Sequence, residues 1–203
     1  MKNIQIDSVN INQLLDKCNT GDLILYSSNN WISYFIEYFT VSQFSHISMI
    51  IKDPIYIKPE LKGIYVLESG YEPNPDPEDN KIKYGVQLTP IEEVIEQYKD
   101  GKSGKLYYRQ LNCLRSKIFN EQIIKVHKQV HNKPYDLDLI DWLGAAFNKD
   151  LQPQKTNRFW CSALVGYFYT MGGILSSDTD WSILTPNDFS LSGENLNYSS
   201  TNT

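Results

Sequence analysis

The feature that most constrains the fold is an alternation of short strand-like runs and turns, with helical segments on both sides. Apolar runs of strand type cover Leu23 to Tyr26, Phe44 to Ile51, Gly63 to Ser69, Tyr84 to Leu88 and Lys105 to Leu111. Neighbouring strands joined by short connections pair antiparallel, because parallel pairing needs a long crossover. The order therefore predicts an α+β fold in which an antiparallel sheet packs against helices.

The helices are predicted from spacing and from end signals. Asn10 and Gln13 form a capping box before the first helix, and Thr89, Pro90 and Glu92 resemble the start of another, with Thr89 as its cap. Helical spacing of apolar residues predicts helices over residues 11–18, 31–39, 90–98, 116–130, 137–147 and 161–171. The aromatic residues of 31–39 are expected in the core, with the wall of an apolar substrate cleft as the alternative.

Length and charge limit the classes of protein that need to be considered. The chain has 203 residues, which suits one domain, placed at residues 1–189, with a Ser/Asn/Thr-rich tail at 190–203 expected to be disordered. A net charge of −5 without a Lys/Arg cluster argues against nucleic acid as a partner. No apolar stretch is long enough to span a membrane, and the N-terminus lacks the features of a secretory signal.

The cysteines indicate both a compartment and a candidate nucleophile. There are three, Cys18, Cys113 and Cys161, and such a small odd set favours a reducing, cytoplasmic location over a disulfide framework. Cys161 alone stands at a predicted helix start, where unpaired N–H groups and the helix dipole favour a thiolate. The alternative is a small buried apolar residue, and Cys18 and Cys113 fit that alternative better.

A histidine and a glutamate occur in neighbouring predicted strands. His46 lies within an otherwise apolar run, and Glu68 lies in the next run. If the two strands are antiparallel neighbours, Glu68 can accept a hydrogen bond from His46 and fix the tautomer of the ring. The alternatives are a structural histidine and an edge carboxylate that faces water, since an unpaired buried charge is costly.

Two further histidines suggest a metal site that the sequence does not complete. His127 and His131 are four residues apart on a predicted helix and share one face, as in two-histidine metal sites. However, Lys128 stands where a zinc protease needs Glu, and no third ligand is near in the sequence. We therefore expect a solvated helix face, with no metal and no cofactor.

Several segments, taken in order, resemble the permuted papain-like amidases. This family is a circularly permuted branch of the NlpC-type hydrolases and includes YiiX/YaeF-like proteins and poxvirus relatives. The segments are Gly21-Asp22-Leu23-Ile24, Trp31-Ile32-Ser33, Phe44-Ser45-His46-Ile47-Ser48, Leu67-Glu68-Ser69, Pro134-Tyr135-Asp136 and Trp160-Cys161-Ser162-Ala163-Leu164-Val165. The histidine strand precedes the cysteine helix, which is the permuted order. The resemblance implies a circularly permuted papain-like fold.

The resemblance also implies roles for individual residues. Cys161 would be the nucleophile, His46 the general base and Glu68 its orienting group, while Tyr135 and Trp160 would contact substrate. The expected function is a cysteine hydrolase that cleaves an amide or ester bond of a small peptide, an N-acyl amino acid or a lipid. An acyltransferase with the same triad and a catalytically silent binding module remain open as alternatives, as does a metal protein using the two helix histidines.

Overall fold

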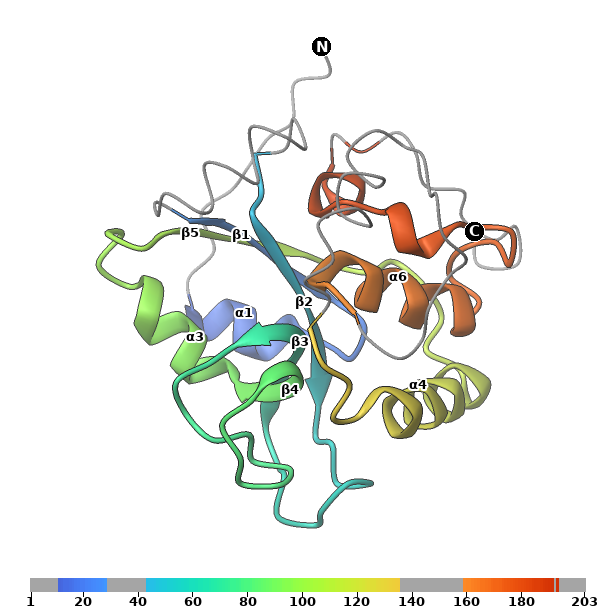
Figure 1. The fold of residues 1–203 in the computed structure, drawn as a ribbon, viewed down its shortest axis with the longest axis horizontal. Helices are drawn as coiled ribbons and strands as arrows, with labels where there is room; N and C mark the ends of the chain where they lie inside the picture. The colour runs from blue at the N-terminus through green and yellow to red at the C-terminus, as the bar shows by residue number, and fades with distance from the viewer. Residues whose placement is uncertain (1–10, 29–42, 136–158, 192, 194–203) are drawn as a thin grey trace.

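The computed structural model of the protein describes residues 11–28, 43–135, 159–191 and 193 (Figure 1). Its helices and strands are α1 (Ile11–Lys17), β1 (Leu23–Ser28), β2 (His46–Lys52), β3 (Ile64–Tyr71), β4 (Tyr84–Pro90), α3 (Ile91–Tyr98), β5 (Gly104–Arg109), α4 (Lys117–Val130) and α6 (Cys161–Met171). Two short 3-10 helices, Trp181–Ile183 and Pro186–Phe189, follow α6. None of the described helices combines the length and the apolar composition that a membrane crossing requires.

The described strands form one antiparallel sheet in the order β4-β3-β2-β1-β5. Strands β1 to β4 are sequential neighbours, whereas β5 returns to pair with β1 at the opposite edge. Met49 of β2 lies opposite Leu23 of β1 on one side and Leu67 of β3 on the other. Strand β2 is therefore the centre of the sheet, and its first residue is His46.

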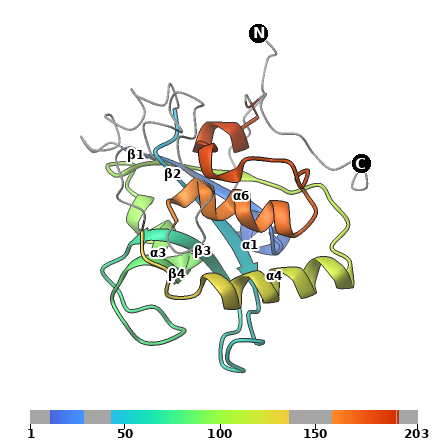
Figure 2. The ribbon, with the colours of Figure 1, turned by 45° about the vertical axis from the view of Figure 1, so that its right-hand side comes forward.

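Helices cover both faces of this sheet (Figures 1 and 2). Side chains of β2 alternate between the faces, so Ile47 and Met49 join one apolar cluster while Ile50 joins another. The first cluster contains the apolar sides of α4 and α6, and the second contains those of α1 and α3. The described part of the chain thus has a three-layer arrangement, with α4 and α6 on one side of the sheet and α1 and α3 on the other.

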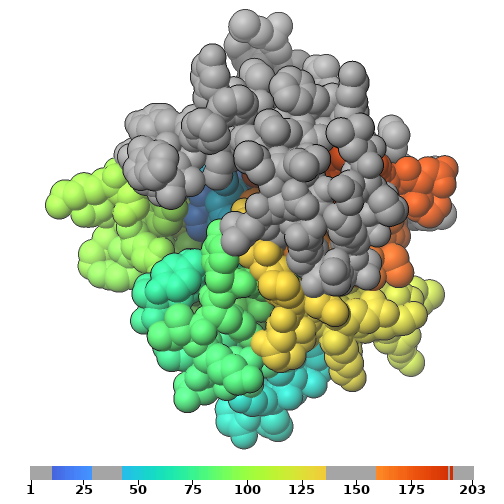
Figure 3. Space-filling view, in the orientation of Figure 1, coloured from blue at the N-terminus to red at the C-terminus, as the bar shows by residue number. Residues whose placement is uncertain are grey.

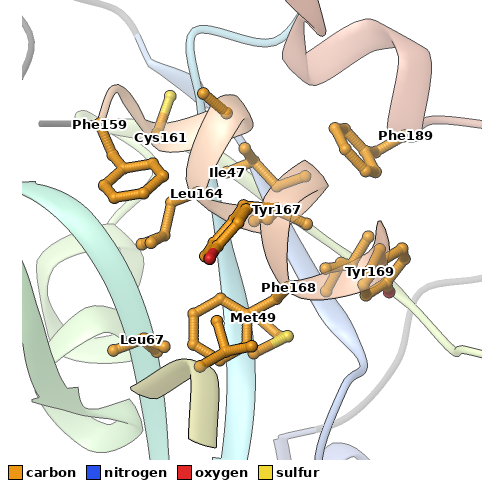
Figure 4. Close-up of a cluster of buried hydrophobic side chains, with 14 of the residues drawn as sticks. Ile47, Met49, Leu67, Phe159, Cys161, Leu164, Tyr167, Phe168, Tyr169 and Phe189 are labelled. Carbon is orange, nitrogen blue, oxygen red and sulfur yellow. The ribbon is translucent and has the colours of Figure 1, made fainter. Parts of the chain in front are cut away.

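Helix α6 is the most deeply buried helix among those described, because apolar residues surround its whole circumference. Every residue from 161 to 169 is buried, and Figure 4 shows Leu164 and Phe168 pointing into the cluster with Met49 and Leu67. The hydroxyl of Tyr169 donates a hydrogen bond to the Gly21 carbonyl at 2.6 Å. The helix is therefore fixed against the sheet along its length.

Most of the predicted elements are present with shifts of one to a few residues at their ends. The predicted helix over 161–171 matches α6 at both ends, and Gly172 forms its C-cap. Thr89 is the main exception: it belongs to β4, the N-cap of α3 is Pro90, and no side chain caps that helix. The predicted helices over 31–39 and 137–147 lie outside the described residues, as does almost all of the tail at 190–203.

Candidate functional site

His46 and Glu68 are brought together by the pairing of β2 with β3. His46 Nε2 lies 2.7 Å from Glu68 Oε2, within hydrogen-bond distance. Glu68 is buried, whereas the His46 side chain keeps 24% of its surface exposed. The hydrogen bond expected from the strand order is therefore present. It uses Nε2, one of the two ring nitrogens of His46.

The second oxygen of Glu68 also has a partner. The Thr89 hydroxyl of β4 donates to Glu68 Oε1 at 2.7 Å, and both residues are buried. From the sequence, Thr89 is predicted to cap a helix, because the following Pro90 and Glu92 match a helix start. In the sheet, Thr89 instead donates a hydrogen bond to Glu68. Without this bond, the buried carboxylate would have lost its hydrogen bonds to water with nothing to replace them.

Cys161 is the first residue of α6, and the segment before it is attached to β3. The Ser69 hydroxyl, next to Glu68 in the chain, donates to the Phe159 carbonyl at 2.6 Å. Trp160 is the N-cap of the helix, and its carbonyl accepts from Leu164 N. These bonds hold the start of α6 beside the strand that carries Glu68. Cys161 is 6% exposed, and its sulfur points away from the labelled apolar side chains in Figure 4.

The electrostatic environment of His46 shows that Cys161 is one of its neighbours. Burial by itself lowers the pKa of His46. The charge of Cys161, a hydrogen bond to it, and the bond and charge of Glu68 together outweigh this effect and raise the pKa from 6.5 to about 10. The charged form of His46 is therefore favoured by its two neighbours, the sulfur and the carboxylate.

The two residues expected to contact substrate lie close to this group. Trp160 is adjacent to the sulfur in the chain, and its buried Nε1–H has no hydrogen-bond acceptor among the described residues. Tyr135 stacks on Tyr84 with ring centroids 4.7 Å apart. Burial raises the pKa of Tyr84, and the charge of Cys161 raises it further, which places this aromatic pair near the thiol. Tyr84 could not be recognised from the sequence as part of this site, because an aromatic residue at a strand end is common.

Glu72 is a second carboxylate near the pair that the sequence analysis did not identify. Burial raises the pKa of Glu72, and the negative charge of Glu68 adds to this effect. A hydrogen bond from Gln97 of α3 and the charge of His46 oppose it. Glu72 directly follows β3, at the start of the loop that leads to β4. The environment of Glu72 depends on its contact with Gln97 of α3, and no local sequence pattern predicts that contact.

A separate group of side chains could hold a metal ion. Glu78, His127 and His131 each offer one ligand atom, and these atoms lie within 4.8 Å of one another. The expectation of a solvated helix face is wrong for His127, which is 2% exposed. The third group, Glu78, comes from the loop between β3 and β4, so it is distant in sequence and near only in the folded chain.

No family model matches the chain, and neither does any curated protein. Among solved structures, the chain is similar to one described as "metalloprotein yiiX from Escherichia coli O157:H7, DUF1105", with a TM-score of 0.52 and 18% sequence identity. The match covers 90% of this chain and 89% of that one. The α+β architecture and its YiiX-like fold are therefore confirmed. At 18% identity the likeness shows the fold alone, because one fold can host many functions.

Proposed function

We propose that this chain is a cysteine hydrolase of amide or ester bonds, with a circularly permuted papain-like arrangement of its catalytic groups. The observation that carries the proposal is the His46–Glu68 hydrogen bond beside Cys161, at the start of a buried helix. A thiol, an imidazole and a carboxylate that orients the imidazole are the groups that thiol hydrolases use. The chain order, with the histidine strand before the cysteine helix, supports the permuted description.

The proposed reaction begins with attack of the Cys161 sulfur on a carbonyl carbon. The proton carried by His46 passes to the leaving amine or alcohol as the C–N or C–O bond breaks, which leaves an acyl thioester on Cys161. A water molecule then attacks the thioester carbonyl and gives one proton to His46 as a new C–O bond forms. The carboxylic acid leaves, and the thiolate–imidazolium pair with which the reaction began is restored. Glu68 keeps the ring oriented throughout and stabilises its positive charge.

Helix α6 contributes more than the position of the sulfur. The first N–H groups of a helix lack partners within the helix, and the dipole favours negative charge at that end. The Cys161 N–H belongs to this first turn, so it is a suitable donor to the oxyanion that forms during attack. Tyr135 and Trp160 are proposed to contact the acyl portion or the leaving group, which is a small peptide, an N-acyl amino acid or a lipid.

The test is the reactivity of Cys161 at mildly acidic pH. Iodoacetamide is small enough for a thiol with low exposure, and peptide mapping by mass spectrometry identifies the alkylated cysteine. Burial raises the pKa of both Cys18 and Cys113, so these two thiols serve as internal comparisons. We expect alkylation of Cys161 alone, and a large decrease in its rate in His46→Ala. Alkylation no faster than that of a free cysteine would support the silent binding module instead.

Substrate profiling then separates hydrolysis from acyl transfer. Esters and amides with peptide-like and fatty-acyl groups are offered to the protein, with and without an added amine or lysolipid acceptor. We expect Cys161→Ala to abolish turnover, since the sulfur forms the covalent intermediate. Products that carry the acceptor would identify an acyltransferase, which uses the same triad.

The E. coli structure is described as that of a metalloprotein. We propose that metal binding is a second property of this chain, separate from the thiol chemistry. Nitrogen and carboxylate donors suit a transition metal, and the group of Glu78, His127 and His131 supplies both kinds. No step of the proposed hydrolysis passes through a metal.

A further inference from the structure

Three side chains from two distant segments meet beside the last turn of α4. His127 lies within that turn, His131 is the C-cap of the helix, and Glu78 lies in the loop between β3 and β4. Glu78 Oε2 is 2.8 Å from His127 Nε2 and 3.0 Å from His131 Nδ1. Both rings therefore direct a nitrogen toward the same carboxylate oxygen.

These separations are close to those of a metal coordination shell. Zn²⁺ binds nitrogen and oxygen ligands at roughly 2.0–2.2 Å, so neighbouring ligands of a tetrahedral site lie about 3.3 Å apart. The observed 2.8 and 3.0 Å, with all three atoms within 4.8 Å, differ from this spacing by amounts that side-chain rotation can remove. Two histidines and one glutamate leave a fourth position for water or another ligand.

Burial makes His127 a better ligand than an exposed histidine would be. Its side chain is 2% exposed, and its Nδ1 atom is buried without a hydrogen-bond partner among the described residues. The ring contacts the Tyr56 ring edge-on at 5.7 Å between centroids, which limits its rotation. An ion pair with Glu78 explains the orientation of Nε2 but leaves Nδ1 unsatisfied. The Tyr56 ring thus packs against one side of the site, and the half-buried His131 leaves the other side accessible to solvent.

Further polar and charged side chains lie beside the three candidate ligands. The Asn132 side-chain amide lies 2.7 Å from His131 Nε2, and Asp79 Oδ2 lies 3.9 Å from the same nitrogen. Nδ1 is the ring nitrogen that faces Glu78, so it is the atom of His131 that would bind the metal. Lys83 pairs with both Asp76 and Asp79 next to Glu78, so these two acids already share a cation from the protein.

We propose that Glu78, His127 and His131 bind a divalent transition metal of the Zn²⁺ class and fasten the β3–β4 loop to the end of α4. Nitrogen donors favour such metals over Mg²⁺ and Ca²⁺, which prefer all-oxygen sites. Figure 3 shows the surfaces of this loop and of the segment after α4 side by side. That segment also pairs with β4, since Val86 N donates to Lys133 O and Tyr135 N donates to Tyr84 O. The metal therefore stabilises the region that carries Tyr84 and Tyr135. The inference rests on the metal binding proposed above and not on the chemistry of Cys161.

The test is a Zn²⁺ titration of the full chain after chelator treatment, by calorimetry and by competition with a chromophoric chelator. We expect one ion per chain, an affinity loss of at least about 100-fold in His131→Ala and in Glu78→Gln, and a rise in the unfolding temperature on Zn²⁺ addition that these variants lose. Lys128→Ala, an exposed change in the same turn, is the matched control and should bind like the wild type. Circular dichroism of each metal-free variant checks its fold, and His131→Ala is preferred to a His127 variant because His131 is half-buried.

Two further variants decide between this site and the thiol group. The chain has three histidines, so His46→Ala leaves only the two proposed ligands of that type. We expect His46→Ala and Cys161→Ala to retain Zn²⁺ affinity, and the spectrum of Co²⁺-loaded protein to lack the near-ultraviolet band of a Co²⁺–thiolate bond. Binding that is lost in Cys161→Ala but kept in His131→Ala would overturn the proposal, as would stoichiometry near zero in the wild type. Neither result would bear on whether Cys161 catalyses hydrolysis.

Discussion

At the scale of single residues, Glu68 is a buried carboxylate whose two oxygens both need hydrogen-bond partners. A buried carboxylate is tolerated only when its oxygens are paired, and Glu68 has His46 at one oxygen and Thr89 at the other. The bond to His46 could be predicted because both residues interrupt apolar runs in neighbouring strands. The bond to Thr89 could not, because the local sequence around Thr89 fits a helix start as well as a strand end.

Replacing Thr89 by Val should weaken the site without changing its shape. The change leaves Glu68 Oε1 buried and unsatisfied, so we expect a loss of about 1–3 kcal/mol in the free energy of unfolding, together with slower alkylation of Cys161. Thr170→Val is the matched control, because the buried Thr170 hydroxyl has no partner among the described residues. Urea unfolding measures both variants, and equal effects of the two changes would contradict the role given to Thr89.

The pKa of His46 predicts a specific dependence of stability on pH. Because the charge of Cys161, a hydrogen bond to it and the neighbouring Glu68 raise this pKa from 6.5 to about 10 in the folded protein, His46 keeps a proton there that it releases in the unfolded chain over this interval. The stabilisation is complete below pH 6.5 and is lost as the pH rises through 10. Urea unfolding across this range should show a steeper decline for the wild type than for His46→Ala. Parallel curves for the two proteins would contradict the shift.

At the scale of secondary structure, α6 combines packing and chemistry in one helix. Its apolar composition and the two glycines after it were sufficient to predict both of its ends, because a buried helix needs apolar residues on every side. Its position could not be predicted. That position depends on Ser69, Phe159 and Tyr169, whose hydrogen bonds connect the helix to the sheet and to the turn before β1.

Gly166 lies where α6 contacts the first 3-10 helix, and the neighbouring side chains leave no room there for a larger residue. A Cβ at this position would lie 2.8 Å from Leu184 Cδ1 and 3.0 Å from Trp181 Cβ. Alanine favours the helical state by up to about 1 kcal/mol, whereas overpacking costs about 1–3 kcal/mol.

We therefore expect Gly166→Ala to lower the free energy of unfolding despite the better helix propensity of alanine. Thermal and urea unfolding provide the measurement. Lys125→Ala on the exposed face of α4 is the control and should change stability by less than about 0.5 kcal/mol. A Gly166→Ala protein more stable than the wild type would show that Trp181 and Leu184 can move away.

At the scale of the whole molecule, Asp22 joins segments that are far apart in sequence. It is fully buried at the start of β1, and it accepts hydrogen bonds from Leu111 N and Tyr108 Oη at 2.8 and 2.7 Å. Arg115 pairs with the same carboxylate and also donates to the Thr20 carbonyl. This group fixes β5 next to β1 and directs the chain from β5 into α4.

Removing the carboxylate should therefore affect the stability of the entire fold. Asp22→Ala leaves Arg115 without its buried partner, and we expect a cost of about 3–5 kcal/mol. Asp100→Ala removes an exposed acid that pairs with Lys102, and its cost should not exceed about 1 kcal/mol. Urea unfolding compares the two, and a small effect of Asp22→Ala would mean that packing alone holds β5 in place.

The sequence by itself determined the elements and their class, because periodicity, caps and turns are local and act through the backbone. It located the strands, the apolar helix that begins at Cys161, and the residues His46 and Glu68 as candidates. Only the tertiary structure decided which groups meet: Thr89 with Glu68, Tyr84 with Tyr135, and Glu78 with the two helix histidines. Such meetings depend on strand order and on helix packing across the sheet, and these are set by the burial of apolar surface over the whole chain rather than by any local pattern.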